Sequence, residues 1–533
     1  MVSQSRQHAV AVSPDDEASA AWGNWRAALA GFLAVAVMLG ISEVVAGGLP
    51  GARSHVVAVG DAVIDRVPGW LERAAISRLG TSDKPFLIGS ILVASGLLGA
   101  GLGILGARRF LYGAVGLAVM AGVGTAASLD DPQTDGAAPL AVGLVSALAG
   151  IVTLWLMLGA IGKAPAAATV TRRPATGGVV DRRRFLGLAG AAVVVAGLGA
   201  VGGRLLSSGE RINEIRRGIR LPRPGTQASP PPPGADLAIP GLSPLFTPNS
   251  DFYRIDTALT VPQVDPAGWS LQVRGMVDRP ISLSYAELMA MPQIEADVTL
   301  TCVSNEVGGD LVGNARWQGV PLYFLLEKAS PQGGATQIIG RSVDGFTAGF
   351  PTAAALDGRE AMVAVAMNGE PLPAKHGFPA RLVVPGLYGY VSATKWLSAI
   401  ELTRFDEVDG YWIPRGWAKL GPIKTQSRID VPAGSSTIPA GQRAIAGVAW
   451  APTRGIERVE VRVDDGPWQQ ATLAASLDAD SWRQWFLRWN ATPGRHILAV
   501  RATDGLGETQ TDKRSRVDPD GATGHHTIRV KVE

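Results

Sequence analysis

The chain has 533 residues, enough for three or four domains, and 47% of them are hydrophobic while only 18% are charged. This balance excludes an ordinary soluble protein and predicts membrane spans. The net charge of +3 does not indicate nucleic-acid binding, because much of the basic excess lies beside apolar segments. The single cysteine excludes an internal disulfide and argues against a structural zinc site, which usually needs several Cys or His ligands.

Five apolar segments in the first part of the chain predict membrane-spanning helices, because each has the length of about 20 residues that crosses a bilayer. We expect these helices to anchor the protein in the lipid bilayer or to dock a partner. None of the six histidines lies inside a segment, so an intramembrane bis-histidine haem is not expected, although other axial ligands remain open. The segments comprise residues 25–46, 85–107, 110–128, 138–161 and 185–206.

The charges of the connections predict the orientation of the spans. Arg108 and Arg109 lie in the second connection and six basic residues lie in the fourth, whereas the third is acidic. Basic loops stay in the cytoplasm, so we expect a cytoplasmic N-terminus and an extracytoplasmic chain after residue 206. The first connection does not fit, because it carries five basic residues on the outer side. Its apolar residues between 63 and 76 predict a helix on the membrane surface.

A basic motif stands directly before the fifth span. The run Arg182-Arg183-Arg184-Phe185-Leu186 resembles a twin-arginine export signal placed inside the chain. Such a signal would export the following domain already folded around a cofactor. A basic helix edge on the cytoplasmic side has the same composition, so both interpretations stay open.

The segment after the spans changes composition twice. Residues 209–234 are polar and then proline-rich, which predicts a semi-rigid spacer. The next loop contains Asn249, Tyr253 and Arg254. These polar and aromatic side chains can grip a ligand or simply cap a domain.

Short elements follow this loop. Residues 270–277 predict a strand, and Ser284 followed by Glu287 has the spacing of a capping box that opens a short helix. Residues 317–328 predict a turn and a second helix.

The only cysteine, Cys302, stands at the end of a predicted strand. Residues 294–302 alternate between apolar and polar side chains, the period of a half-buried strand. The loop that follows contains Gly308, Gly309 and Gly313, which permit turns that place main-chain N–H groups near an anion. A lone thiol in this position can be a metal ligand, a nucleophile or a small core residue.

A second polar cluster surrounds the buried segment 382–385. His376 and Arg381 precede this segment, and Ser392 and Lys395 follow it among glycine turns. These side chains are the donors that a phosphate needs. A solvated loop between two strands would have a similar composition, so the residues alone leave both interpretations open.

From about residue 245 to the C-terminus, the chain resembles the sulfite oxidase family of molybdenum-cofactor oxidoreductases, including its exported bacterial members. Four motifs carry the resemblance in order: residues 249–253, Cys302 with its glycine-rich loop, residues 376–381 and residues 389–396. The resemblance implies that Cys302 binds molybdenum together with the two sulfurs of one pterin dithiolene, the cofactor called molybdopterin. Soft sulfur ligands suit such a metal.

The resemblance also implies roles for other residues. The cofactor-binding residues would be Asn249, Tyr253, Arg254, His376, Arg381, Ser392 and Lys395. The catalytic residues would be Cys302 with Tyr388 and Tyr390, the two tyrosines being placed in the substrate pocket.

One departure concerns the substrate. Sulfite-oxidising members of the family carry an arginine a few positions after the cysteine, whereas this chain has no arginine there and places the carboxylate of Glu306 among those positions. A carboxylate repels sulfite. The resemblance therefore implies two-electron oxygen-atom transfer on a small substrate that is sulfite-like or sulfoxide-like. The missing arginine counts against sulfite itself.

From about residue 444, short alternating strands and Asp-Gly turns predict an antiparallel sandwich. In the resembling family this part is immunoglobulin-like and often serves dimerisation. We expect its tryptophans to fill the core.

The predicted fold is a five-helix transmembrane bundle, then an α+β molybdopterin-binding domain of the sulfite oxidase type, then an all-β immunoglobulin-like sandwich. The expected boundaries are 1–24 for a cytoplasmic tail, 25–206 for the bundle, 207–240 for a Pro-rich linker, 241–435 for the molybdopterin-binding domain and 436–533 for the sandwich.

The leading hypothesis is a multi-pass, membrane-anchored oxidoreductase with its catalytic domain outside the cytoplasm. Its expected partners are a small-molecule substrate and an unidentified electron-transfer partner, and a homodimer stays open. No nucleic acid is expected to bind. Two alternatives remain. One is a non-catalytic electron-relay or binding module on the same fold, and the other is a cysteine hydrolase with Cys302 as nucleophile and His376 as base.

Overall fold

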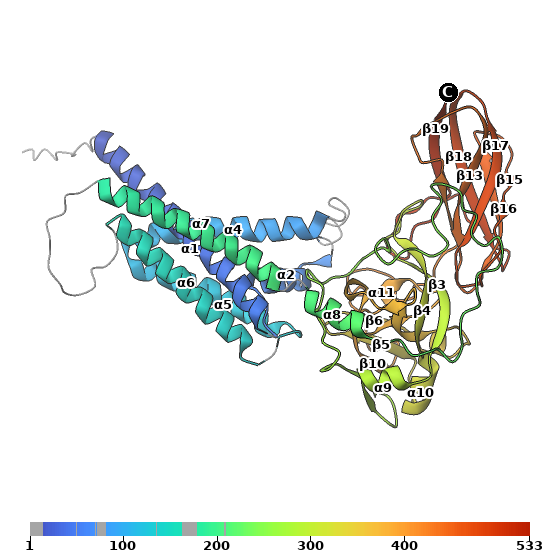
Figure 1. Cartoon of the computed structure of the whole chain (residues 1–533), viewed down its shortest axis with the longest axis horizontal. Coiled ribbons are helices and arrows are strands. Elements are labelled where there is room, and N and C mark those ends of the chain that lie inside the picture. Colours follow the sequence, from blue (N-terminus) through green and yellow to red (C-terminus); the bar gives the residue numbers. More distant parts are fainter. Residues whose placement is uncertain are drawn as a thin grey trace, which may run out of the picture. The chain divides into compact units, whose positions relative to one another are not determined.

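The computed structural model describes residues 14–49, 51–69, 71, 82–134, 136–162, 179–206 and 209–533. The chain divides into two compact units, Met1–Gly209 and Glu210–Glu533. The first unit is helical and the second is rich in strands (Figure 1). Most of the predicted cytoplasmic tail, most of the first connection beyond residue 69 and the basic residues 163–173 lie outside the described residues.

Five helices among the described residues are long and apolar enough to cross a membrane, which confirms the five predicted segments. Their apolar spans are Asn24–Gly48, Asp83–Arg108, Phe110–Asp130, Ala138–Ala160 and Arg182–Arg204. They belong to α1 (Pro14–Gly48), α4 (Asp83–Arg108), α5 (Phe110–Asp130), α6 (Ala138–Ala160) and α7 (Val179–Leu206).

Helices α1 and α4 meet across glycines. A side-chain carbon added at Gly103 would lie 2.0 Å from the carbonyl oxygen of Ala27, and one added at Gly31 would lie 2.0 Å from the carbonyl oxygen of Gly99. Neither position can carry a side chain unless the helices separate. Close approach across small residues is how helices associate in lipid, where no hydrophobic force draws them together.

Replacing Gly103 by alanine is therefore expected to lower the melting temperature of the full chain in detergent by several degrees. The added methyl meets rigid backbone, and such overpacking costs about 1–3 kcal/mol. Gly101→Ala is the matched control, because nothing lies within 4 Å of a carbon added there. Equal melting temperatures for the two variants would show that α1 and α4 do not make this contact.

The helix predicted on the membrane surface over residues 63–76 lies only partly within the described residues, because residues 70 and 72–76 fall outside them. Helix α2 begins much earlier and spans His55–Arg66. It ends there because the next residue, Val67, is extended. Pro68 follows, and a proline disfavours helical backbone in the residue before it.

Two basic residues of the first connection, Arg53 and Arg66, pair with the acidic third connection. Arg53 lies 3.1 Å from Asp131, and Arg66 lies 2.6 Å from Asp130. These contacts bring the start of the first connection and the start of the third to the same end of the unit. Local neutralisation gives a physical reason why these two basic residues depart from the loop-charge rule.

The second unit begins with two sheets. Their strand orders are β2-β1-β10-β5-β6 and β3-β4-β7-β8, and β9 pairs with β7. The strands are β1 (Ser270–Gly275), β2 (Ile281–Ser284), β3 (Ile294–Thr301), β4 (Val312–Pro321), β5 (Gln337–Ser342), β6 (Thr347–Pro351), β7 (Met362–Met367), β8 (Glu370–Pro371), β9 (Arg381–Val383) and β10 (Leu397–Thr403). The helices and helical turns are α8 (Glu210–Gly218), α9 (Tyr285–Ala290), α10 (Leu322–Ala329), η2 (Thr352–Ala355), η3 (Ala374–His376) and α11 (Gly389–Ser392).

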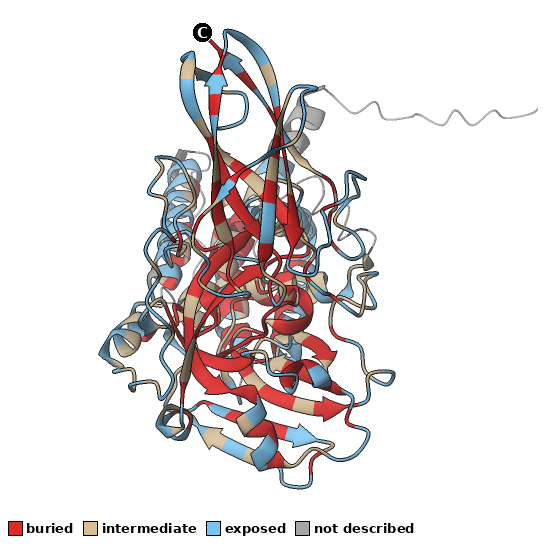
Figure 2. Ribbon diagram, turned by 90° about the vertical axis from the view of Figure 1, so that its right-hand side faces the viewer, coloured by how far each residue is buried: buried red, intermediate tan, exposed pale blue. Residues whose placement is uncertain are grey.

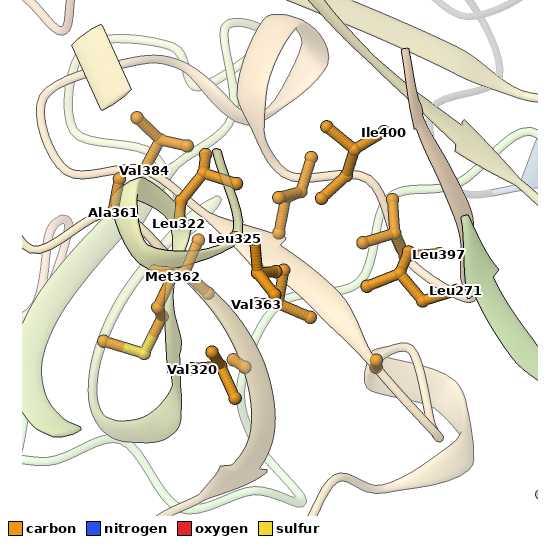
Figure 3. Packing of buried hydrophobic residues seen from close by; sticks show 14 of the residues in the cluster. Leu271, Val320, Leu322, Leu325, Ala361, Met362, Val363, Val384, Leu397 and Ile400 are labelled. Carbon is orange, nitrogen blue, oxygen red and sulfur yellow. The ribbon is translucent and has the colours of Figure 1, made fainter. Parts of the chain in front are cut away.

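One hydrophobic core joins these two sheets. Leu271 and Leu397 come from the first sheet and Val320 and Val363 from the second, and all four belong to the same buried cluster. Helix α10 adds Leu325 to it. Figure 3 shows these side chains gathered from separate strands around the helix. The core fixes the sheets against each other and so fixes the loops that leave their strands.

Two local predictions have different outcomes. The capping box is confirmed, because the side chain of Ser284 accepts from the backbone of Glu287 and the Glu287 carboxylate accepts in return from the Ser284 N–H at 2.8 Å. The turn and helix predicted over residues 317–328 are wrong at their start, because Trp317 lies inside β4. The helix, α10, begins only after Pro321, which ends the strand.

The proline-rich segment, for which composition predicts a semi-rigid spacer, makes direct contacts with the folded domain. It packs along the second unit, because its carbonyl groups accept hydrogen bonds from the domain. Gln318 donates to the Pro222 carbonyl at 2.8 Å, and Arg316 donates to the Ser229 carbonyl at 2.8 Å. Proline lacks an N–H, but an extended proline-rich backbone still presents every carbonyl as an acceptor.

Two further sheets form the C-terminal part. Their orders are β11-β13-β17-β16 and β12-β19-β18-β14-β15. Their strands are β11 (Gln426–Val431), β12 (Thr437–Ile438), β13 (Gly441–Trp450), β14 (Ile456–Val463), β15 (Gln469–Gln470), β16 (Thr472–Leu473), β17 (Arg483–Ala491), β18 (Gly494–Asp504) and β19 (His526–Val532).

These two sheets share one hydrophobic core. It includes Ile445 and Trp485 from the first of them and Val459 and Val500 from the second. Buried and exposed residues alternate along the strands near the C-terminus (Figure 2). Trp485 is fully buried and Trp489 nearly so, as expected for tryptophans that fill a core. The immunoglobulin-like assignment stays a prediction.

Candidate functional site

Cys302 lies immediately after β3, in a tight loop that returns to β4. Its N–H donates to the Leu311 carbonyl at 2.9 Å, and its own carbonyl accepts from the N–H of Asn305 at 3.0 Å. The side chain of Asn305 closes the loop by accepting from the N–H of Leu311 at 2.9 Å. These bonds hold the sulfur in a fixed place at the end of the strand.

The strand that carries Cys302 is buried on both faces, whereas its alternation predicted only one buried face. Thr299 is fully buried and accepts from the N–H of Trp482 at 2.7 Å. Ser481 donates to the Asp297 carbonyl at 3.1 Å. A segment almost two hundred residues further along the chain therefore covers the polar face of the strand. The alternation is real, but its polar side chains are satisfied inside the protein.

The carboxylate of Asp297 is part of this cover. It is 4% exposed and receives two hydrogen bonds from the guanidinium of Arg316, at 2.7 and 2.8 Å. The side-chain hydrogen bond to Asp297 raises the pKa of Arg316. This bidentate pair fixes β3 against β4 just before the cysteine.

Arg316→Ala is expected to lower the free energy of unfolding of the second unit by about 3 kcal/mol, because it leaves the Asp297 carboxylate buried and unpaired. Urea unfolding of the full chain, followed by tryptophan fluorescence, measures the change. The control is Arg341→Ala, which removes a half-exposed pair with Glu401 and should cost less than about 1 kcal/mol. Equal losses for the two variants would contradict the account of the β3–β4 pair.

The thiol of Cys302 is 7% exposed. Burial raises its pKa, whereas the N–H and hydroxyl of Ser304 and the nearby ammonium of Lys395 oppose that rise. The thiolate therefore has hydrogen-bond donors and a positive charge close to it in a site that otherwise disfavours charge. These surroundings suit a thiol that gives up its proton to a soft metal ion.

The first predicted loop and the second polar cluster meet at Asn249 and His376. His376 is buried, and its Nε2 lies 3.0 Å from the carbonyl oxygen of Asn249. The amide of Asn249 donates to the Met367 carbonyl at 3.1 Å and accepts from Asn368 at 2.9 Å. Burial lowers the pKa of His376 to about 3, so the imidazole is neutral at physiological pH. The two motifs form one structure although 127 residues separate them.

Arg381 is a buried cation beside this contact. Its guanidinium is centred 5.0 Å from the ring of Trp317 and donates to the His376 carbonyl at 3.1 Å. Burial lowers its pKa to about 10, so it remains protonated at neutral pH. The pKa of the Tyr253 phenol is raised by burial and by nearby Cys302, and Arg381 opposes that rise. Tyr253 thus lies within electrostatic reach of both the thiol and the guanidinium.

Arg254 and Lys395 converge on one carboxylate, that of Asp256. Lys395 Nζ lies 2.9 Å from Asp256 and also donates to the Ile255 carbonyl at 2.9 Å. Arg254 Nε lies 2.7 Å from the same carboxylate, whose side chain is 3% exposed. Burial lowers the pKa of Lys395 to about 8. Sequence reasoning missed Asp256, because nothing in its neighbourhood marks it as the partner of a lysine 139 residues away.

The remaining predicted residues have neighbours of their own. The hydroxyl of Ser392 is fully buried and lies within hydrogen-bond distance of the carbonyls of Tyr388 and Leu387, at 3.0 and 3.2 Å. Tyr388 accepts from the N–H of Lys424 at 3.4 Å, and Tyr390 donates to the Ala418 carbonyl at 2.5 Å. Both phenols therefore contact residues 418–424. The roles of these three residues toward a cofactor or substrate stay predictions.

Sequence reasoning missed two further features of the site. The hydroxyl oxygen of Thr301, next to the cysteine, is buried and has no hydrogen-bond partner among residues 209–533. A side-chain carbon at Gly389 would come within 3.9 Å of the Tyr253 phenol oxygen and 4.0 Å of the Thr301 carbonyl. A buried soft sulfur, an unpaired hydroxyl and several cations together form a donor set that fits a metal cofactor carrying a phosphate.

The geometry does not favour a cysteine hydrolase. Nε2 of His376 is committed to the Asn249 carbonyl, and the low pKa of the imidazole makes it a poor general base. No hydrogen bond joins Cys302 to His376 within the described part of the second unit. A nucleophilic cysteine needs a base within reach of its sulfur.

The comparison with protein families places a molybdenum-cofactor domain over the described site. Residues 258–412 match the oxidoreductase molybdopterin binding domain. This match includes Cys302, His376, Arg381 and Lys395 but begins after the Asn249 loop.

Individual relatives agree with that match. Human mitochondrial sulfite oxidase is 31% identical over 316 residues, which cover 50% of this chain and 57% of the human protein. The uncharacterized oxidoreductase YuiH of Bacillus subtilis (strain 168) is 37% identical over 157 residues, which cover 30% of this chain and 76% of that protein. The chain therefore spans a little more than half the length of the mammalian sulfite oxidases that it matches.

A solved structure also aligns with the chain. The sulfane dehydrogenase SoxCD of Paracoccus pantotrophus is 22% identical, with a TM-score of 0.49, over 54% of this chain and 82% of that one.

Proposed function

The chain belongs to the sulfite oxidase family of molybdopterin-dependent oxidoreductases, and from this premise we propose that it is a membrane-anchored, extracytoplasmic enzyme that transfers an oxygen atom to or from a small substrate. The observation that carries the proposal is the buried Cys302 thiol, held at the end of β3 beside Tyr253 and Lys395. When bound, the molybdenum cofactor supplies the two-electron redox chemistry.

In this proposal Cys302 holds the metal and serves the reaction directly. Burial raises the pKa of the thiol, so a bound metal would favour the thiolate that the buried site alone disfavours. The Ser304 donors and the Lys395 ammonium then stabilise the sulfur's negative charge. The tight loop from Cys302 to Leu311 keeps the sulfur in place.

The polar residues around the sulfur would hold a single pterin dithiolene and its phosphate. Arg381 supplies a buried positive charge, and Arg254 and Lys395 supply two more that Asp256 neutralises only in part. The neutral His376 joins the Asn249 loop to the strand that begins at Arg381. This single contact fixes the two cofactor-binding segments relative to each other. The excess of cations favours a doubly charged phosphate.

The substrate that we propose is a neutral, sulfoxide-like molecule. The positions after Cys302 offer no cation. Asn305 is buried and bonded within the loop, and Glu306 is exposed. An exposed carboxylate four residues after Cys302 repels sulfite and leaves a neutral sulfoxide unaffected.

The membrane unit would anchor the enzyme, with its N-terminus in the cytoplasm. The pairs Arg53–Asp131 and Arg66–Asp130 support the placement of the first and third connections on one side, as the orientation requires. Arg182, Arg183 and Arg184 precede the apolar core of α7, as a twin-arginine signal or a cytoplasmic helix edge would. An immunoglobulin-like C-terminal domain and a homodimer belong to the same proposal.

Metal and pterin analysis of the purified full chain tests the proposal most directly. We expect about one molybdenum and one pterin per chain, and a higher kcat/KM for a small sulfoxide with a reduced dye than for sulfite with ferricyanide. Protein that carries neither metal nor pterin would favour the non-catalytic alternative. Faster turnover of sulfite than of sulfoxides would overturn the substrate assignment and leave the cofactor assignment intact.

A further inference from the structure

The outward face of the sheet β12-β19-β18-β14-β15 carries an unusual charge distribution. Alternate residues of its three central strands point into the shared core, among them Val461, Val500 and Val530. The intervening residues of β14, β18 and β19 carry six cations and two carboxylates, those of Glu457 and Glu460. The six are Arg458, Arg462, Arg495, Arg501, Arg529 and Lys531. We call these six residues the cationic face.

Strand pairing brings these like charges together. Arg495 stands directly opposite Lys531 across the β18–β19 pair. Like charges in opposite positions destabilise a sheet. Glu460 compensates Arg501, at 2.8 Å, and lies 3.7 Å from Arg458. Glu533 pairs with Lys531 as well, so the carboxylates of the chain compensate only some of the six cations.

Three of the cations lack an acidic partner inside the chain. No carboxylate lies within 4.0 Å of Arg462, Arg495 or Arg529 among residues 209–533. The guanidinium of Arg462 lies 4.9 Å from the ring of Trp468, and its buried Nε has no hydrogen-bond partner in that same range. The guanidinium of Arg501 lies 4.4 Å from the same ring. Arginine and tryptophan together are typical of the centre of a protein interface.

One end of the sheet that carries the cationic face lies beside the Cys302 loop. The ring of His526, the first residue of β19, lies against Gly308, where an added side-chain carbon would be 2.2 Å from the imidazole. Gly308 has a φ of +81°, which a glycine adopts without strain. Val500 pairs with His526, so Arg501 lies at the end of the face nearest that loop. A partner on this face would therefore dock on a sheet that contacts the loop of the proposed redox centre.

We propose that the cationic face docks an acidic, one-electron-carrying protein that exchanges electrons with the centre at Cys302. The inference rests on the proposed function, which requires such an exchange. In the oxidative direction, the substrate takes one oxygen atom from water, two protons and two electrons are released, and two partner molecules each accept one electron. In the reductive direction two reduced partners supply the electrons, two protons are taken up and water is formed.

The surface chemistry favours a protein over the other candidates. A second copy of the same face would repel it, since these strands expose six cations against two carboxylates. Binding to a bilayer surface needs apolar side chains that enter the lipid. Ile497 is the large aliphatic residue on the outward positions of these strands, and it is 43% exposed.

The test uses the full holoprotein in nanodiscs of neutral lipid, with an acidic c-type cytochrome as probe and a basic one as comparator. We expect the acidic probe to bind with an affinity that falls about tenfold between about 50 and 200 mM salt. The triple variant Arg462→Glu, Arg495→Glu and Arg529→Glu should weaken binding about a hundredfold, and the milder triple change to glutamine about tenfold. The matched control reverses Arg404, Arg443 and Arg488, three exposed arginines outside the cationic face.

Turnover with a small dye and the molybdenum content are measured on the same samples. Both should stay unchanged in every variant, so a failure of the docking proposal is separable from a loss of the cofactor. Equal binding of the acidic and basic cytochromes, or equal loss in the control triple, would overturn the proposal. So would a homodimer that only the Arg462, Arg495 and Arg529 triple dissolves, or competition by nanodiscs of anionic lipid, since each would assign the face to another occupant.

Discussion

Replacing Cys302 by alanine is expected to abolish oxidoreductase turnover, by about three orders of magnitude or more, and to remove molybdenum from the protein. The reason is that Cys302 is the one soft side chain of the site, so no other residue can take its place as a thiolate ligand. The second unit should remain folded, because a buried cysteine packs as a small hydrophobic residue and its truncation costs about 1 kcal/mol. Elemental analysis, turnover and thermal unfolding of the same preparation measure the three effects.

Val303→Ala is the matched control for Cys302→Ala. It shortens the neighbouring buried side chain, which belongs to the cluster that joins the site to the C-terminal sheets. It should cost about 1–2 kcal/mol of stability and leave the metal content unchanged. If Cys302→Ala kept normal molybdenum and normal turnover, the thiol would not be the ligand and the proposed function would fail.

The second large effect concerns Arg381, for which function and stability are expected to change in opposite directions. Arg381→Met should remove most of the bound pterin and metal, because it deletes the most deeply buried positive charge of the site. The same change should raise the free energy of unfolding of cofactor-free protein by about 1–3 kcal/mol. The physical reason is that burial lowers the pKa of Arg381 to about 10, which means that the folded protein holds this charge at a cost.

Arg483→Met is the matched control for this second experiment. Arg483 also donates to backbone carbonyls, those of Ala474 and Ile456 at 2.7 and 2.9 Å, but lies in the C-terminal sheets. Its replacement should leave pterin and metal content unchanged. Pterin fluorescence after denaturation and urea unfolding of the cofactor-free protein separate the two effects. A destabilised Arg381→Met protein would show that the guanidinium serves the fold and not the cofactor.

The sequence predicted well where neighbouring residues decide the structure. The five spans follow from the length of their apolar segments, and the capping box of α9 follows from Ser284 and Glu287, which are only three residues apart. The strand that presents Cys302 follows from its alternation. Each of these features depends on periodicity or on contacts within a few residues, which a sequence displays directly.

Prediction failed where distant residues decide the structure. The proline-rich segment was expected to be a semi-rigid spacer, and its composition did not reveal that carbonyls such as those of Pro222 and Ser229 accept hydrogen bonds from β4. The half-buried strand is buried on both sides, because residues 480–482 lie across it. Composition and alternation describe what a segment can do, and only the rest of the chain determines which partner it finds.

The amino-acid sequence by itself determined the membrane unit, the strand that ends in Cys302 and the family to which the chain belongs, because local hydrophobicity and motif order encode all three. Only the tertiary structure decided which side chains surround the thiol and how their charges are balanced. Asp256 joins Lys395, and His376 joins Asn249, across more than a hundred residues. Electrostatic interactions depend on the distances between charged groups in space. Those groups come close together only when the two sheets pack on their common core.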